Sequence, residues 1–151
     1  MTILASAAAM VGLSTPAHAD THWTGVKQYL KNSSTGRCLT PISSGGSNLV
    51  HTGACSGWKW MQGTDRAGIR YTADSGASCL DNNGKDVYVL SCTFNFEGMN
   101  WWPVAEGPGM VIFNSDRTKV LTGWNDGKVT VEPPVYDTSS PTYRKQHWNW
   151  A

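Results

Sequence analysis

Two stretches of the sequence carry nearly the same signal, STGRCLT at residues 34–40 and SGASCLDN at residues 75–82. Both place Cys-Leu after a run of small and turn-forming residues, and the residue that follows Leu differs between them. Cys38 and Cys79 lie 41 residues apart, and a further 41 residues lead to Val120, which is again followed by Leu. A constant spacing of this kind predicts a fold built from one repeated unit.

A tryptophan keeps the same phase as the Cys-Leu pair. Trp60 and Trp101 are also 41 residues apart, and Trp148 ends the third unit after a proline-rich insertion at residues 133–141. Two kinds of marker in phase are hard to obtain by chance, so the sequence predicts three units that fill the chain after its N-terminal segment. The expected repeats are residues 23–64, 65–105 and 106–151.

Within the units the local pattern is that of β-strands. Short runs of β-branched and aromatic residues at 87–90 and 129–131 each follow a turn sequence, at 82–85 and 125–128. Asn-Gly and Asp-Gly in these turns supply the positive φ that tight two-residue hairpin turns require. Outside the N-terminal segment, no stretch shows helical spacing of apolar residues over twelve or more positions. The sequence therefore predicts an all-β domain made of hairpins.

Length and charge narrow the class of partner. A chain of 151 residues is expected to form one domain with a moderate core. Lys and Arg number 12 against 11 for Asp and Glu, so no strong electrostatic field attracts phosphate groups. We therefore expect no nucleic-acid partner.

The N-terminus has the pattern of a secretory signal. An apolar run from Ile3 to Leu13 precedes Ala17-His18-Ala19, an Ala-x-Ala processing site. We expect residues 1–19 to be a signal peptide cleaved after Ala19, and residues 20–151 to be a single secreted domain. The run is too short to span a membrane and no second candidate follows it, so no membrane span is predicted.

Export changes how the four cysteines are interpreted. An oxidising compartment favours disulfides over thiolate chemistry, and the residues by themselves allow three pairings. No two cysteines have the Cys-x-x-Cys spacing of a zinc site, so we expect no metal. The cysteines are Cys38, Cys55, Cys79 and Cys92.

Gln146-His147-Trp148 is an intact Gln-x-Trp motif, and its counterparts in the other units keep only Trp60 and Trp101. With Cys-Leu at constant period, this motif makes residues 23–151 resemble the ricin B-type β-trefoil lectins, the Gln-x-Trp family typical of carbohydrate-binding module family 13. The resemblance implies a pseudo-threefold barrel with a cap of hairpins, in which Gln146 and the three tryptophans mark the fold.

The resemblance also implies a disulfide inside a repeat, which would pair Cys38 with Cys55 and Cys79 with Cys92. The third repeat has Val120 at the first cysteine position and no cysteine near the proline-rich insertion. It is therefore expected to lack a bridge and to depend on packing.

In this lectin family an Asp after Cys-Leu binds sugar hydroxyls and an aromatic residue stacks on the sugar ring. Only Asp81 keeps the acid, since Thr40 and Thr122 take the other two places. The stacking aromatic is missing, and Tyr88 is a candidate substitute that could equally pack across its strand pair. Asp81 is interpreted either as a sugar ligand or as a hydrogen-bond acceptor for the following turn. Asn100 completes this tentative carbohydrate set.

Aromatic residues other than the marker tryptophans suggest a surface that binds a protein partner. Trp124 lies beside the turn at 125–127, and Phe94 and Phe96 lie in the loop at 93–99. Aromatic side chains are enriched at the centres of protein interfaces, so these three are candidates for contact with a protein partner.

Catalysis has little support in the sequence. No motif of a hydrolase, metalloprotease or phosphate loop is present, and Asp81 and Asp86 flank a tight turn where a solvated hairpin explains them. No cofactor is predicted. The sequence thus favours a secreted, non-catalytic recognition module that binds glycan weakly at no more than one site, or a protein partner. The alternative is an adaptor subunit of a secreted, toxin-like assembly without sugar binding, the chain being monomeric by itself or part of a hetero-complex.

Overall fold

The computed structural model describes residues 21–41, 48–65, 67–73 and 77–151. The predicted signal peptide, residues 1–19 with cleavage after Ala19, lies outside the described residues. The described part consists of strands and three short 3-10 helices. In chain order they are β1 (His22–Gln28), β2 (Leu30–Asn32), β3 (Cys38–Pro41), β4 (Val50–Gly53), β5 (Trp60–Asp65), β6 (Gly68–Thr72), β7 (Ser78–Asn82), β8 (Val87–Ser91), η1 (Cys92–Phe94), η2 (Glu97–Met99), β9 (Trp102–Glu106), β10 (Gly109–Phe113), β11 (Val120–Gly123), β12 (Val129–Glu132), η3 (Tyr143–Gln146) and β13 (Trp148–Trp150).

A closed barrel forms one layer of the molecule. Antiparallel pairing runs from β1 through β5 to β6, and from β9 through β10 and β13 to β2. The bridge between Ile69 and Trp101, with backbone hydrogen bonds of 2.9 and 2.8 Å, joins β6 to β9. Because β2 follows β1 in the chain after Tyr29, these strands together form a ring.

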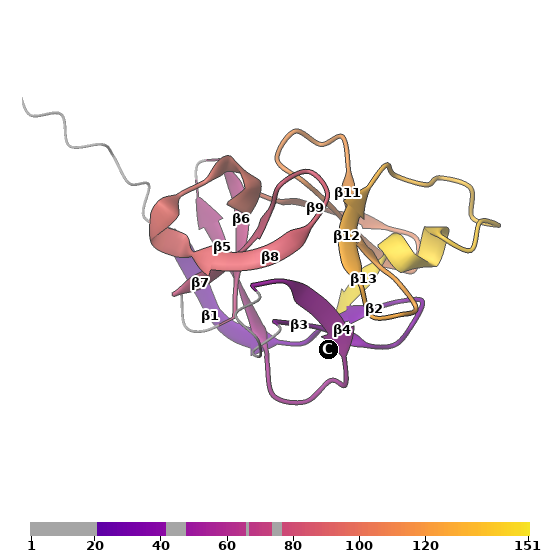
Figure 1. Cartoon of the computed structure of the whole chain (residues 1–151), viewed down its shortest axis with the longest axis horizontal. Helices are drawn as coiled ribbons and strands as arrows, with labels where there is room; N and C mark the ends of the chain where they lie inside the picture. Colours follow the sequence, from indigo (N-terminus) through magenta and orange to yellow (C-terminus); the bar gives the residue numbers. More distant parts are fainter. Residues whose placement is uncertain (1–20, 42–47, 66, 74–76) are drawn as a thin grey trace, which may run out of the picture.

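Three hairpins cover one end of the barrel, one from each unit: β3–β4, β7–β8 and β11–β12. In Figure 1 they surround the centre of the view, coloured from purple through pink to orange. Their inner strands are joined by equivalent backbone hydrogen bonds of 2.8 to 2.9 Å. These bonds run from Thr52 N to Gly127 O, from Val89 N to Asn48 O and from Val131 N to Lys85 O. The chain is therefore a β-trefoil with pseudo-threefold symmetry, as predicted.

The three tryptophan markers explain why the sequence repeats. Each is fully buried, and each indole Nε1 donates to the carbonyl oxygen of the leucine of its own unit's hairpin. The bonds measure 2.7 Å to Leu39, 3.0 Å to Leu80 and 2.9 Å to Leu121. The marker tryptophan thus fastens the end of each unit to its cap hairpin, and the leucines and tryptophans together form much of the core.

The two predicted disulfides are confirmed, Cys38–Cys55 and Cys79–Cys92. In the third unit, Gln146 ties the proline-rich insertion to the cap. Its Oε1 accepts from the Val135 backbone N–H at 2.7 Å, and its Nε2 donates to the Pro133 carbonyl at 2.9 Å and lies 3.3 Å from the Thr122 hydroxyl. A buried amide with these bonds takes over the local fastening that a bridge provides in the other units.

One detail of the predicted hairpins is wrong. Between β7 and β8, Asn83 N donates to Asp86 O, so residues 84 and 85 form the expected two-residue turn. The positive φ of 87° falls on Gly84. Between β11 and β12 the turn has three residues, because Trp124 N donates to Lys128 O at 2.8 Å and the positive φ falls on the third turn residue, Gly127. A three-residue turn ending in a left-handed glycine is a common hairpin alternative.

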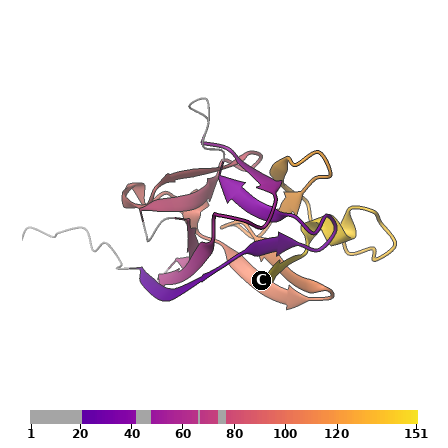
Figure 2. The same ribbon diagram turned by 90° about the horizontal axis from the view of Figure 1, so that it is seen from below.

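Figures 1 and 2 place β1 and η3 at opposite ends of the molecule. Between them lie the other barrel strands and the cap hairpins. Within the described residues, no helix is long and apolar enough to cross a membrane.

Candidate functional site

Asp81, the tentative sugar ligand, lies in β7 opposite Tyr88 of β8. Only 1% of Asp81 is exposed. Its Oδ1 accepts a hydrogen bond of 2.7 Å from the Asn82 backbone N–H, and its Oδ2 is buried without a partner among the described residues. Gly98 of η2 packs directly on this carboxylate and on the Asn82 carbonyl, leaving no room for a Cβ. In this structure the segment around Gly98 occupies the space through which a sugar would reach Asp81.

Burial determines the protonation behaviour of Asp81 and its neighbour. Desolvation raises the pKa of the Asp81 carboxyl, while the Asn82 N–H and the nearby Tyr88 hydroxyl act in the opposite direction. Tyr88 influences that pKa from close by, but its hydroxyl does not complete a hydrogen bond of ordinary geometry to Oδ2. The pKa of Tyr88 is also raised, first by desolvation and then by the charges of Asp81 and Asp86. The Tyr88 hydroxyl therefore stays protonated at neutral pH.

The equivalent positions in the other units are threonines whose hydroxyls are used by the fold. Thr40 lies opposite His51, and its hydroxyl donates to the Cys38 carbonyl at 3.3 Å. Thr122 is fully buried and donates to the Val120 carbonyl at 3.0 Å. The Thr122 hydroxyl is therefore closed to solvent, and the Thr40 hydroxyl already donates to its own strand.

Asn100, the third tentative carbohydrate residue, is nearly buried and supports the loop that covers Asp81. Its Oδ1 accepts from Arg70 Nε at 3.3 Å, and the same guanidinium donates from another nitrogen to Asn95 Oδ1. Asn95 has a φ of 52°, in the left-handed region. Arg70 thus joins the side chains of Asn100 and Asn95, and ties Asn100 to the segment from η1 to η2, residues 92–99.

Phe94 and Phe96, two of the candidate interface residues, project from that segment. Their side chains are 56% and 50% exposed, and their rings stack with centroids 5.4 Å apart and planes inclined by 5°. The segment is held at its start by the Cys79–Cys92 bridge and at its end by the Asn82 side chain, which donates to the Gly98 carbonyl at 2.9 Å. The result is an exposed aromatic pair on a firmly held loop.

Trp124, the third candidate interface residue, is half-buried and does not join this pair. Its Nε1 donates to the Thr130 hydroxyl at 2.8 Å, and Lys145 Nζ lies 5.1 Å from its ring centroid. These contacts fix the indole against β12. Trp124 therefore supports the third hairpin, with only part of its ring available to a partner.

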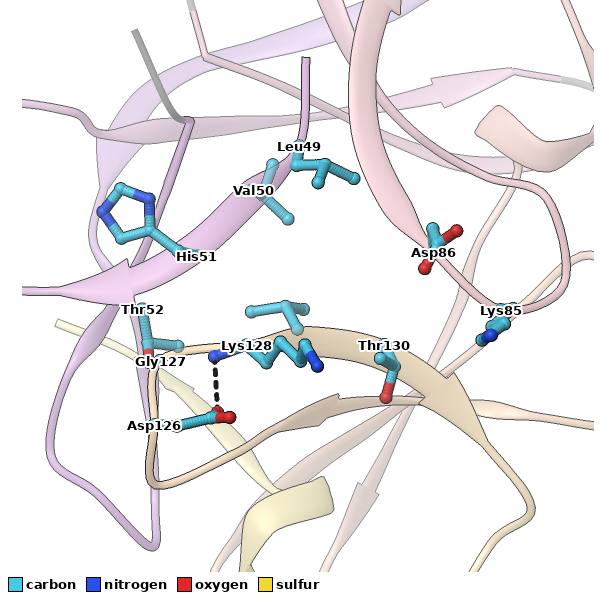
Figure 3. Close-up of a pocket in the computed structure, with 11 residues that line it drawn as sticks. Leu49, Val50, His51, Thr52, Lys85, Asp86, Asp126, Gly127, Lys128 and Thr130 are labelled. Carbon is cyan, nitrogen blue, oxygen red and sulfur yellow. Dashed lines mark hydrogen bonds between the residues drawn. The ribbon is translucent and has the colours of Figure 1, made fainter. Parts of the chain in front are cut away.

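A pocket opens where the three cap hairpins meet on the pseudo-threefold axis, and we call it the axial pocket. It has a volume of about 420 Å³ and is lined by Leu49, Val50, His51, Thr52, Lys85, Asp86, Asp126, Gly127, Lys128, Val129 and Thr130. Figure 3 shows Leu49 and Val50 on one side, Lys85 and Asp86 on another, and the Lys128 side chain extended toward Thr130 on a third. All three units contribute to this pocket.

The axial pocket combines an apolar wall with charges of both signs. Two lysines and two aspartates line it, so its formal charges cancel, and the valines and Leu49 supply the apolar part. The Thr52 side chain is almost fully buried, and its hydroxyl has no hydrogen-bond partner among the described residues. In the part of the chain that the structure describes, no group of three or more His, Cys, Asp or Glu could hold a metal ion.

The sequence did not predict the axial pocket: it places Asp86 beside one hairpin turn and residues 125–128 in another, with nothing to bring them together. A signal was present in the sequence. Each of the three inner hairpin strands begins with Val, at Val50, Val87 and Val129, and aligning these valines brings the pocket residues into correspondence. The 41-residue phase of the Cys-Leu pairs does not, because the three hairpin connections differ in length.

Solved structures with this fold include proteins of several kinds. No protein-family model matches the chain, and no curated protein sequence matches it. Lysenin, in a complex with phosphocholine, matches with a TM-score of 0.64 and 14% identity over 84% of this chain and 44% of that chain. The chain therefore spans less than half the length of lysenin.

Two further matches have nearly the length of this domain. The cytolethal distending toxin of Haemophilus ducreyi gives a TM-score of 0.63 and 18% identity, covering 83% of this chain and 82% of that chain. A proteinase inhibitor from Coprinopsis cinerea gives 0.65 and 12%, covering 83% and 95%. At these identities the similarity establishes the β-trefoil fold and nothing finer.

Proposed function

We propose that the chain is a secreted, non-catalytic recognition module that binds a protein partner through the Phe94–Phe96 pair. The observation that carries this proposal is the stacking of two half-exposed phenylalanines on a segment held at both ends. Exposure of apolar aromatic rings to water is unfavourable, and contiguous exposed apolar side chains often mark a surface that binds another protein. A loop that is already ordered loses little conformational entropy on binding, which favours affinity.

The alternative, glycan binding at the second repeat, is less well supported by the same structure. Asp81 is buried under Gly98, and the hydroxyls of Thr40 and Thr122 bond to their own strands. A sugar would have to displace the η1–η2 segment and break its fastening before it met the carboxylate. Sugar binding at a single lectin site is weak, and the free energy needed to open the segment would weaken it further.

Proteins of similar fold offer an analogy for protein recognition. The Coprinopsis cinerea protein is a proteinase inhibitor, and the Haemophilus ducreyi protein is a toxin. Analogy at the level of fold does not identify a function, because trefoils carry many. It adds to the argument only that this scaffold can serve in protein contacts, including those of a toxin-like assembly.

The proposal is tested by cross-linking the mature domain to proteins in the culture supernatant of its source. A variant with Phe94→Ser and Phe96→Ser should lose the cross-linked partner, while Val104→Ser, which removes an apolar side chain 47% exposed on β9, should keep it. Asp81→Asn should also keep it, and free galactose should not compete. Retention of the partner without both phenylalanines, or elution by sugar, would overturn the proposal.

A further inference from the structure

The axial pocket places three different chemistries at positions that the fold makes equivalent. Each inner hairpin strand forms one bridge to the next, Leu49 to Tyr88, Asp86 to Thr130 and Lys128 to His51. The first members of these bridges therefore correspond to one another around the axis. One is an aliphatic side chain, one an acid and one a base.

The two charged members have no partner of opposite charge in the described parts of the chain. Neither the Asp86 carboxylate nor the Lys128 ammonium group forms a hydrogen bond or ion pair there, and in particular they do not pair with each other. Both residues are exposed along the rim of the same pocket. A ligand that carries one positive and one negative group could therefore pair with the Asp86 carboxylate and the Lys128 ammonium group at the same time.

We propose that the axial pocket binds a small zwitterion, a molecule in which a short apolar body joins one amine and one carboxylate. The amine would contact Asp86 and the carboxylate would contact Lys128. The apolar body would lie against Leu49 and Val50, which Figure 3 shows on a different side of the pocket from Lys128. Free amino acids and ω-amino acids belong to this class.

Two further features of the pocket fit this class of ligand. A volume of about 420 Å³ is in the range of small-molecule sites, which are mostly apolar with a few placed polar groups. The lining also combines apolar side chains with a few charged ones, which matches a ligand that has an apolar body and two charged ends.

Because two lysines and two aspartates line the pocket, ligands with a single charge or no charge should bind it more weakly than a zwitterion. A monoanion attracted by Lys85 and Lys128 also meets Asp86 and Asp126, and a monocation meets the reverse arrangement. A neutral sugar would leave both charges without a counter-charge. A zwitterion is the simplest species that supplies a counter-charge to both Asp86 and Lys128.

The experiment is an NMR titration of the oxidised, ¹⁵N-labelled mature domain at low salt. The probes are 4-aminobutyrate and 6-aminohexanoate, compared with butyrate, butylamine and galactose at the same ionic strength. We expect the amides of Thr52, Gly127 and Lys128 to shift with one of the two zwitterions. Affinity for either singly charged analogue should be at least about threefold weaker, as expected for a partly solvated charge pair, and added salt should weaken zwitterion binding.

Charge variants separate a ligand contact from a structural effect. Asp86→Asn and Lys128→Gln should each weaken zwitterion binding at least about threefold. The double variant Asp86→Lys with Lys128→Asp should recover binding, because it restores both charges and the ligand can reverse. Asp116→Asn, on the exposed turn before β11, is the control and should bind like the parent domain.

Several outcomes would overturn the inference. They are equal binding of butyrate, butylamine or galactose, failure of the charge-swapped domain to recover binding while it remains folded, and shifts located away from the pocket. Removal of Phe94 and Phe96 should leave zwitterion binding unchanged. The axial site can therefore fail or succeed independently of the proposed protein interface.

Discussion

The indole Nε1 of Trp148 donates a hydrogen bond of 2.9 Å to the carbonyl oxygen of Leu121, and both residues are fully buried. The same bond joins Trp60 to Leu39 and Trp101 to Leu80. In the third unit it acts without a disulfide beside it. The same contact, from a buried indole N–H to a leucine carbonyl, therefore recurs in all three sequence repeats.

We expect Trp148→Phe to lower the free energy of unfolding by about 2–4 kcal/mol. The substitution leaves the buried Leu121 carbonyl without its donor and leaves part of the ring space empty. Urea denaturation followed by far-ultraviolet circular dichroism measures the change. Trp124→Phe is the matched control, because it removes a half-buried indole bonded to Thr130, and it should cost less than about 1.5 kcal/mol. Equal losses in the two variants would contradict this account of the marker tryptophans.

Removal of either disulfide should cost about 3 kcal/mol, since the bridges close loops with sequence separations of 17 and 13. The two losses should differ in location. Replacing Cys79 and Cys92 by Ala should speed amide hydrogen exchange in the segment that carries Phe94 and Phe96, because the bridge holds its first residue. Replacing Cys38 and Cys55 should leave exchange in that segment unchanged. Equal exchange in both variants would show that the bridge does not fix the aromatic pair.

Gly98→Ala should destabilise the domain by about 1–3 kcal/mol, the usual cost of an extra group in a packed site. A Cβ at this position would overlap the Asp81 carboxylate and the Asn82 backbone carbonyl. Because the second of these is backbone, Asp81→Ala should not restore stability to the Gly98→Ala domain. Gly53→Ala is the control, since its Cβ would meet only the His51 side chain at 3.4 Å. Thermal unfolding of the three variants distinguishes these effects.

Asp81→Asn should stabilise the domain at pH 7. Burial raises the pKa of Asp81 above its ordinary value of 3.8, so the folded state binds this proton more tightly than the unfolded state. The stability that the group contributes is complete below pH 3.8 and is lost as the pH rises through the raised pKa. The advantage of the Asn variant should therefore shrink as the pH falls toward 3, which urea titrations at several pH values can measure.

Asp116→Asn provides a control of opposite sign. Hydrogen bonds from the Thr118 side chain and backbone lower the pKa of Asp116. Its contribution is present above pH 3.8 and is lost as the pH falls through the lowered pKa. This variant should be the less stable one at pH 7, with the difference fading in acid. The same pH trend for both variants would exclude the burial of Asp81 as the cause.

The fold could be predicted because its decisive contacts are periodic in the sequence. The indole-to-carbonyl bond joins residues 21 positions apart in the first two units. In the third unit the separation is 27, because the proline-rich insertion lies between Leu121 and Trp148, and the bond is kept even though Val120 replaces cysteine. The family resemblance then supplied the disulfide pairing, which the structure confirms. The three-residue turn before Lys128 was missed because Asp-Gly is compatible with more than one hairpin turn.

The candidate sites were harder to predict because they depend on loops that break the period. The connection from Pro41 to Val50 is longer than that from Asn82 to Val87, so Leu49 and Asp86 fall out of phase although they are equivalent in space. The burial of Asp81 is a tertiary effect of Gly98, on a separate segment. Local sequence around Asp81 contains no sign of it.

The backbone bonds that join the cap hairpins are independent of the side chains around the axis. The carbonyls that accept these bonds belong to Asn48, Lys85 and Gly127, whose side chains differ, yet the bond lengths are 2.8 to 2.9 Å in all three units. The residues at Leu49, Asp86 and Lys128 can therefore be exchanged in combination while the scaffold that displays them is kept. This makes the hub of the trefoil a natural place for a designed library, in which three addressable positions, one per unit, are varied to select binders for new small molecules.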